Sequence, residues 1–298
     1  MNWSYIVSGI SIVNDIIYAD NRRTAGLLGG CCVFAYSGIR LLTEAVLPVT
    51  SCGSDFTDYF GDYWKHNRIP SDGVYHSMPF THHTVLKYNT DGSWKEESIY
   101  GKDYFEKQAK NCDVTYEKLF PFLSPSLKGL YLDSNAFERI FNDIEKIREK
   151  APNARIMWEP TTVSYTDPTL RETVLNNINK VDFYSCNLSE AMMFFEAESR
   201  EKVVSSIINL QKPCFLREGE KGSSWIENGI DTGTIPSEKA DQAVDPTGCG
   251  NCSTAVSLYL RREGFKPREI CAVANHIAFL TAKQHGPIPE LNCYYEDL

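Results

Sequence analysis

The sequence lacks the features of several specialised protein classes. No apolar run approaches the roughly 20 residues that a membrane-spanning helix needs, and residues 1–20 have no basic stretch followed by an apolar block. Positive charge is not in excess, because 30 Lys and Arg residues stand against 39 Asp and Glu residues, a formal net charge of −9. These absences argue against a membrane protein, an exported protein, and a protein that binds nucleic acid or an anionic membrane surface.

The 298 residues also lack repeats, low-complexity stretches and a clear linker, which predicts a single domain over residues 1–298. Cysteine, in contrast, is plentiful at ten residues. Several cysteines lie in apolar segments, where cysteine behaves as a small hydrophobic residue, and no export signal accompanies them. We therefore interpret them as reduced thiols and expect the protein to be cytoplasmic.

Short apolar runs alternate with amphipathic segments along most of the chain. We expect strands at residues 5–10, 47–50, 127–132, 155–160, 181–185 and 212–216, and helices at residues 55–66, 136–150, 167–178, 191–195 and 267–285. This alternation predicts an α/β fold in which helices cover both faces of a mainly parallel sheet.

A different pattern interrupts this order at residues 84–94, where polar and apolar residues alternate around Asp91-Gly92. That pattern is typical of a β-hairpin. Three histidines, His76, His82 and His83, lie just before it. No carboxylate or cysteine stands at ligand spacing beside them, so we expect ordinary surface residues and not a metal site.

Residues 245–251, Asp-Pro-Thr-Gly-Cys-Gly-Asn, lead from a polar turn into an apolar helix. A glycine turn before a helix exposes unpaired backbone N–H groups, which together with the helix dipole favour an anion such as phosphate. A plain tight turn before a core helix also fits. Cys249 and Cys252 have the spacing of a redox pair, although no thioredoxin-like context surrounds them, and a zinc site would lack further ligands.

This segment resembles the C-terminal signature of the ribokinase-like (PfkB) family of small-molecule kinases, usually Asp-Thr-x-Gly-Ala-Gly-Asp. The resemblance implies that Gly248, Cys249 and Gly250 form an anion hole for the transferring phosphate. It implies that the last position is the catalytic base on the acceptor hydroxyl. That position is Asn251 here, and an amide cannot take up a proton at neutral pH.

The resemblance also implies the architecture: a three-layer α/β/α sandwich with a small β-sheet lid, whose strands fall within about residues 11–28 and 75–100. Asp245 and Thr247 of the same signature are assigned to nucleotide binding. In the family the lid covers the substrate and often forms a dimer contact, so a homodimer through the lid is one expectation.

Two motifs near the N-terminus are similar to the family's substrate site. Asp15 stands where the family holds substrate hydroxyls, and we expect it at the carboxyl end of the first strand, although a lone Asp is commonly a turn residue. Gly29 and Gly30 are similar to the first glycine motif, which lets a ligand approach the backbone. Ribokinase has an Asn four residues later, and Phe34 stands there in this chain.

Three further motifs are similar to the family's nucleotide and metal site. Asn187 and Glu190 match Asn-x-x-Glu, in which the carboxylate organises the Mg²⁺ shell, and the same residues form a helix-capping pattern. Gly219 and Gly222 match Thr-x-Gly-x-x-Gly, but Arg217 replaces the Thr, so that it either pairs with phosphate or blocks the nucleotide. The position of Asn275 is similar to the adenine pocket, and on composition it is an ordinary polar helix residue.

Two functions follow from this resemblance. The first is an ATP-dependent phosphotransferase that uses Mg²⁺ and moves the γ-phosphate to a hydroxyl of a small sugar, polyol or nucleoside. The second is a binding or regulatory protein that kept the fold and lost the base at Asn251. A base is commonly worth about 10²–10⁴ in rate, so its loss would slow phosphoryl transfer without necessarily abolishing it.

Overall fold

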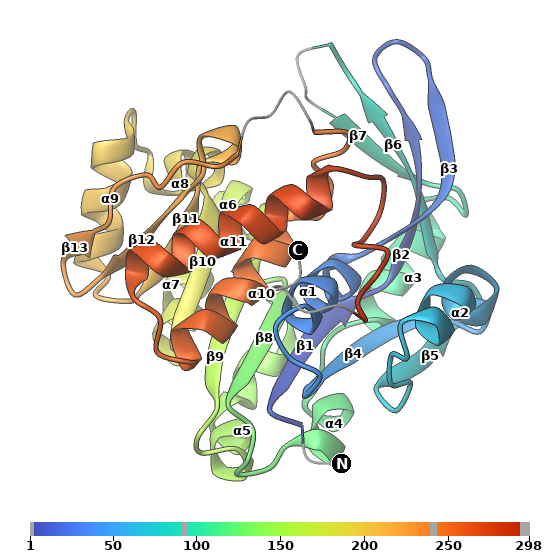
Figure 1. Cartoon of the computed structure of the whole chain (residues 1–298), viewed down its shortest axis with the longest axis horizontal. Helices are drawn as coiled ribbons and strands as arrows, with labels where there is room; N and C mark the ends of the chain where they lie inside the picture. The colour runs from blue at the N-terminus through green and yellow to red at the C-terminus, as the bar shows by residue number, and fades with distance from the viewer. Residues whose placement is uncertain (1–2, 91–93, 239–242, 293–298) are drawn as a thin grey trace.

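A computed structural model describes residues 3–90, 94–238 and 243–292. Its centre is a nine-stranded sheet in the order β13-β12-β11-β10-β9-β8-β1-β4-β5 (Figure 1). The strands from β11 to β5 are parallel, and β12 and β13 extend the sheet antiparallel at one edge. Their bounds are β1 Tyr5–Ile10, β4 Val46–Gly53, β5 Val74–Met78, β8 Gly129–Ser134, β9 Arg155–Pro160, β10 Phe183–Asn187, β11 Cys214–Arg217, β12 Ser223–Glu227 and β13 Ile230–Asp231.

Helices cover both faces of this sheet (Figure 1). On one side lie α1 (Cys31–Arg40), α2 (Phe56–His66), α10 (Cys249–Arg262) and α11 (Pro267–Ala282). On the other lie α5 (Ile144–Lys150), α6 (Thr162–Thr166), α7 (Arg171–Lys180), α8 (Leu188–Phe195) and α9 (Arg200–Asn209). The remaining helices are α3 (Lys102–Asn111), α4 (Tyr116–Leu119) and the 3₁₀ turns η1 (Phe120–Phe122), η2 (Arg139–Asn142), η3 (Pro168–Leu170) and η4 (Gly219–Lys221).

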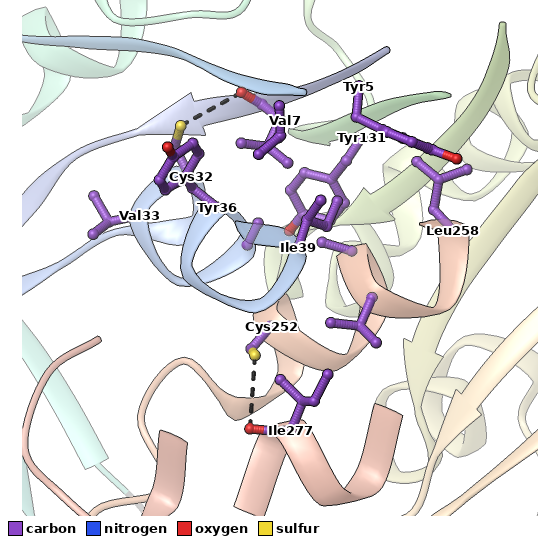
Figure 2. Packing of buried hydrophobic residues seen from close by; sticks show 14 of the residues in the cluster. Tyr5, Val7, Cys32, Val33, Tyr36, Ile39, Tyr131, Cys252, Leu258 and Ile277 are labelled. Carbon is purple, nitrogen blue, oxygen red and sulfur yellow. Dashed lines mark hydrogen bonds between the residues drawn. The ribbon is translucent and has the colours of Figure 1, made fainter. Parts of the chain in front are cut away.

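The strands are apolar on both faces because each face has its own core. Along β1, Tyr5 and Val7 belong to the core under α1 and α10, while Ile6 between them belongs to the core on the opposite side. Figure 2 shows side chains from α1, α10, β1 and β8 meeting in the first of these layers. This double burial is what continuous apolar strands in a parallel sheet indicate. The predicted α/β class is confirmed.

A second sheet of four strands stands beside the first, in the order β3-β2-β6-β7 (Figure 1). Its strands are β2 Ile12–Ile17, β3 Arg23–Gly29, β6 His82–Tyr88 and β7 Trp94–Ser98. We call it the small sheet. The hairpin of β6 and β7 agrees with the prediction, although its turn at residues 91–93 lies outside the described residues. β5, expected near the small sheet, pairs with β4 in the large sheet instead.

The small sheet touches the loop before α10. The hydroxyl of Tyr88 lies 3.3 Å from the Oγ1 of Thr247. Tyr18 stacks on Tyr88, and its hydroxyl lies 3.1 Å from Nδ1 of His285, just beyond α11. The small sheet is therefore fixed against the segment that the sequence marks as a phosphate loop.

Two helix predictions were wrong in detail. The helix expected at residues 136–150 is divided into η2 and α5, because Asp143 has φ −112° and leaves the helical conformation. Phe137, which the periodicity placed on the apolar stripe, is exposed. The last helix ends at Ala282 instead of residue 285. No helix in the described ranges is long and apolar enough to span a membrane.

Candidate active site

Polar side chains from three parallel strands meet at the carboxyl edge of the large sheet. Asp133 lies near the end of β8, Glu159 near the end of β9, and Arg217 at the end of β11. The N-terminus of α10 faces them, and Asn251 lies in its first turn. Ligands bind at this edge in open α/β sheets, since the loops and helix N-termini gather there.

The start of α10 has the backbone that a phosphate loop requires. Gly248, the residue before the helix, has φ +80°, a conformation that side chains other than glycine rarely adopt. The ring of Phe34 lies directly against it, where a Cβ would otherwise stand. The N–H groups of the first helical turn have no acceptor inside the helix, although that of Cys249 reaches the carbonyl of Pro246 at 3.2 Å.

Asp245 and Thr247, expected to bind nucleotide, shape this loop. One carboxylate oxygen of Asp245 accepts hydrogen bonds from the backbone N–H of Thr247 at 3.0 Å and from its hydroxyl at 2.6 Å. The other oxygen lies 3.4 Å from His285. Asp245 is buried, so its contacts give it a bracing function in the loop before α10.

Asn251 joins the helix to β8 through two hydrogen bonds. Its Nδ2 donates to Oδ2 of Asp133 and to the hydroxyl of Tyr131, both at 3.2 Å. The Tyr131 hydroxyl in turn donates to Glu159 at 2.7 Å. Burial and the neighbouring Glu159 raise the pKa of Asp133 well above its usual range. Sequence reasoning missed Asp133, although a carboxylate directly after the strand expected at residues 127–132 was the available signal.

Arg217 lies across the start of α10. Its Nη1 forms an ion pair with Oε1 of Glu159 at 2.9 Å, and a Cβ at Gly250 would collide with the same nitrogen. Burial opposes the charge, but Glu159 and Glu190 outweigh it and raise the pKa of Arg217. A fixed positive charge therefore stands beside the predicted anion site. Glu159 was also missed by sequence reasoning.

Asn187 and Glu190 form the capping box that the sequence indicates. The Asn187 side chain accepts from the Glu190 N–H at 2.8 Å, and Glu190 accepts from the Asn187 N–H at 3.2 Å. The other oxygen of Glu190 accepts from the Thr162 hydroxyl at 2.9 Å. The described residues contain no cluster of three His, Cys, Asp or Glu side chains around a cation position. Glu190 is thus a lone carboxylate, which suits a hydrated Mg²⁺ held through water.

Gly222 and Asn275 lie against the segment after β13, and Gly219 begins the turn before Gly222. Gly222 has φ +113°, and the backbone at Ile235 occupies the space of a Cβ. The Asn275 amide is buried, donates to the carbonyl of Ile235 at 2.8 Å and accepts from the Ser223 hydroxyl at 2.7 Å. Gly219 has φ +62° and open space around it. Protein contacts thus already account for Gly222 and Asn275.

The predicted position of Asp15 was wrong. It lies within β2 of the small sheet, not at the end of β1, because Ser11 separates the two strands. Its carboxylate accepts from the Gly26 N–H at 2.8 Å and pairs with His83 at 3.0 Å. The neighbouring Asn14, which points to the opposite face, is buried against Gly29 and accepts from the Thr84 hydroxyl at 3.0 Å.

Gly29 and Gly30 allow close packing of the chain before α1. Asn14 fills the space beside Gly29. Gly30 has φ +94°, and the backbone of β1 and β2 fills the space where its Cβ would stand. Both glycines are required by these close approaches, whichever ligand binds.

The contacts of the cysteines and histidines argue against the redox and metal alternatives. The nine cysteines in the described part of the chain are free. Burial raises the pKa of both Cys249 and Cys252 to about 12, so neither is a reactive thiolate. Of the three histidines, His76 lies 2.8 Å from the Gly53 carbonyl and His83 pairs with Asp15. The expectation of surface residues was wrong for His82 and His83, which are buried.

Comparison with known proteins identifies the class of protein. The profile of the pfkB family of carbohydrate kinases matches residues 33–292, and the chain belongs to this family. No curated protein sequence matches it.

Solved structures share the fold at low sequence identity. A nucleoside kinase from Methanocaldococcus jannaschii is 16% identical with a TM-score of 0.74, covering 99% of this chain and 97% of its own. An adenosine kinase from Sinorhizobium meliloti is 16% identical with a TM-score of 0.73, covering 97% and 96%. A ribokinase from Cryptococcus neoformans var. grubii, solved with ADP, is 14% identical with a TM-score of 0.75, covering 100% of both chains. These likenesses establish the ribokinase-like fold.

Proposed function

We propose that the protein is an ATP-dependent phosphotransferase that moves the γ-phosphate to a hydroxyl of a small sugar, polyol or nucleoside. The observation that carries the proposal is the meeting of the first turn of α10, Arg217 and Asp133 at one edge of the sheet. Family membership supports the reaction class. Phosphoryl transfer depends mainly on positioning and charge stabilisation, and this edge offers both.

The proposed roles follow from the contacts. The N–H groups of Gly248, Cys249 and Gly250, supported by the dipole of α10, stabilise the transferring phosphate. Arg217 pairs with a phosphate oxygen through donors that Glu159 leaves available. Glu190 holds a hydrated Mg²⁺, which shields the phosphate charge. Gly219, Gly222 and Asn275 shape the wall on which the nucleotide base lies.

The acceptor binds between the small sheet and the start of α10 in this proposal. Tyr88 and Thr247 join the two parts, so the small sheet acts as a lid over the acceptor. On this arrangement the small-sheet residue near the acceptor is Asn14, not Asp15, because Asn14 shares a face with Thr84 while Asp15 turns to His83.

The test is a panel of sugars, polyols and nucleosides incubated with ATP and Mg²⁺, with ADP release as the readout. Acceptor-dependent ADP is the expected result, and it should vanish when EDTA removes the metal. The same panel without acceptor measures background hydrolysis. Tight nucleotide binding with no acceptor-dependent ADP across the panel would contradict the proposal.

One observation favours the second candidate, a binding or regulatory protein. The pair of Arg217 and Glu159 lies across Gly250, and Phe34 covers Gly248, so protein side chains already contact both glycines of the loop. If these contacts persist in solution, the loop does not admit phosphate. Calorimetric titration with ADP separates the candidates: the kinase binds it, and a protein with a closed loop does not.

We also propose that the protein works in the cytoplasm as a homodimer through the lid. β3 is an edge strand of the small sheet, and of its seven residues three are exposed and only Gly29 is buried. Exposed edges pair readily with other strands. Light scattering on the purified chain tests the dimer. Replacing Thr24 by Pro on β3 should produce a monomer if pairing runs through this edge.

A further inference from the structure

The residue at position 251 cannot be the base, so the proton of the acceptor must leave by another route. Four carboxylates lie near the start of α10: Asp133, Glu159, Glu190 and Asp245. Asp245 is buried, and its oxygens already contact Thr247 and His285. The four carboxylates differ in how many of their oxygens already accept hydrogen bonds or ion pairs from the protein. This difference identifies the candidate base.

The oxygens of Glu159 and Glu190 already accept hydrogen bonds or ion pairs from other residues. The two oxygens of Glu159 accept from Tyr131 and Arg217, and its side chain is 5% exposed. The two oxygens of Glu190 accept from Thr162 and from the backbone N–H of Asn187. Neither carboxylate can take up a proton without losing an ion pair or a helix cap.

Asp133 has a different environment. Its partners are the amide of Asn251 at 3.2 Å and the thiol of Cys31, and it keeps partial contact with solvent. Because a carboxylate only accepts hydrogen bonds, it turns the N–H side of the Asn251 amide toward itself. The carbonyl oxygen of Asn251 therefore faces away from Asp133 and remains able to accept.

We propose that Asp133 is the general base of this enzyme and that Asn251 holds Asp133 and the acceptor hydroxyl in register. This inference rests on the proposed phosphotransferase function. The base then lies at the end of β8 instead of in the first turn of α10. The hydrogen bond from Asn251 to Asp133 joins these two positions. Asp133 is the catalytic residue, and Asn251 is the positioning residue.

The step balances without a further reactant. The O–H bond of the acceptor breaks, and its proton passes to a carboxylate oxygen of Asp133. The hydroxyl oxygen forms a bond to the γ-phosphorus of ATP. The bond from that phosphorus to the β–γ bridging oxygen breaks, and its electron pair leaves with ADP. The first turn of α10 and Arg217 stabilise the charge on the transferring group.

The environment of Asp133 predicts the pH dependence. Burial and Glu159 raise its pKa, whereas Arg217 lowers it by a smaller amount, so the carboxylate is ionised only above the range usual for Asp. The charge of Glu138 also raises the pKa of Asp133, and the other groups that face it, Cys31, Tyr131 and Asn251, are uncharged. Turnover should therefore rise with pH along a single limb as Asp133 loses its proton. Glu138→Gln removes the second carboxyl group that titrates in this range and should leave the rising limb in place.

The experiment compares Asp133→Asn, Asn251→Asp and the double variant with the wild type, using an acceptor from the panel. Asp133→Asn should lower kcat by about 10²–10⁴-fold, with unchanged affinity for ADP, and should remove the rising limb of the pH profile. The double variant restores a carboxylate at the first turn of α10 and should turn over about 10-fold faster than Asp133→Asn. Asp72→Asn, at an exposed loop position, is the matched control for the change in charge.

Each other outcome has a definite meaning. If the wild type turns over and Asp133→Asn turns over equally, the base assignment fails and the kinase function stands. If the wild type binds ADP without turnover and Asn251→Asp alone gains turnover, the phosphate site stands and Asp133 is not a base. If neither turns over any acceptor, both proposals fail. Should Asp133→Asn not fold, Asp133→Glu retains the carboxylate, and a loss of its rising pH limb would overturn the assignment.

Discussion

Two arginines in this protein lie in neighbouring networks and have different hydrogen-bonding states. Arg200, at the start of α9, donates to Glu218 at 3.0 Å, to Asp231 at 2.8 Å and to Ser224 at 3.1 Å. Arg217, on β11, pairs with Glu159 alone, and its buried Nε has no hydrogen-bond partner in the described part of the chain. Each guanidinium nitrogen of Arg200 thus donates to an acceptor, whereas, within the described residues, the Nε of Arg217 does not.

This difference supports the proposed role of Arg217 in phosphate binding. A guanidinium has five N–H donors, and a buried donor without a partner costs free energy. Arg217 lies beside the start of a helix, where its available donors match the oxygens of a phosphate. The predictions below test this contrast, from the largest expected effect to the smallest.

Gly250→Val should have the largest effect. A Cβ at this position collides with Nη1 of Arg217, so the end of that side chain must move away from the start of α10. We expect turnover to fall by about 10²–10³-fold, the range for losing one donor to a developing charge. Steady-state ADP release measures it. Ala272→Val, on the exposed face of α11, also creates a valine in a helix but away from the site, and serves as control. Equal turnover in both variants would contradict the placement of Arg217.

Arg200→Met should destabilise the fold without acting on the site. It leaves Glu218, whose side chain is 2% exposed, as a buried charge without its cation. Breaking such a pair costs about 3–5 kcal/mol of the free energy of unfolding, measured by urea denaturation. Arg155→Met is the control, because Arg148 still pairs with the same Asp182 and Arg155 is 53% exposed. A loss below about 1 kcal/mol, as for a surface pair, would mean that Arg200 is not structural.

Glu138 extends the comparison of buried charged groups to a carboxylate. Its hydrogen bonds come from Asn135 and not from an arginine. Burial raises its pKa from 4.5 to about 7. Since the folded state prefers the proton, this stabilisation is present below pH 4.5 and is lost as the pH rises through 7. The loss between pH 4 and 8 should be about 3 kcal/mol. Glu138→Gln should flatten the pH dependence of unfolding by that amount, and an unchanged slope would contradict the raised pKa.

The structural features that depend on residues close together in the sequence could be predicted. The capping box of Asn187 and Glu190 joins positions three apart, and the apolar runs of the central strands indicate their double burial directly. The order of motifs along the chain added the family resemblance, which the pfkB match confirms.

The composition of the site could not be predicted in the same way. Asn251 and Asp133 are 118 positions apart, and only the sheet order brings β8 under the start of α10. Asp15 and Asn14 show the second limit. Asp15 was expected at the carboxyl end of the first strand but lies within β2, and one residue along a strand exchanges the two faces of a sheet.

Arg217→Thr tests whether Arg217, unlike Arg200, binds phosphate. We expect this variant to have the smallest effect on the fold. The variant places the residue usual in the family at this position, and Glu159 keeps its hydrogen bond from Tyr131. If Arg217 binds phosphate, affinity for ADP should fall by about 10–100-fold, because a hydrogen bond to a charged group contributes about 1.5–3 kcal/mol. Arg217→Lys keeps the charge without the planar fork and should lie between the two. Calorimetric titration of the three proteins measures this order. If Arg217→Thr binds ADP more tightly than the wild type, Arg217 blocks the loop. The donors of Arg217 that have no partner among the described residues would then belong to a closed site and would not bind phosphate.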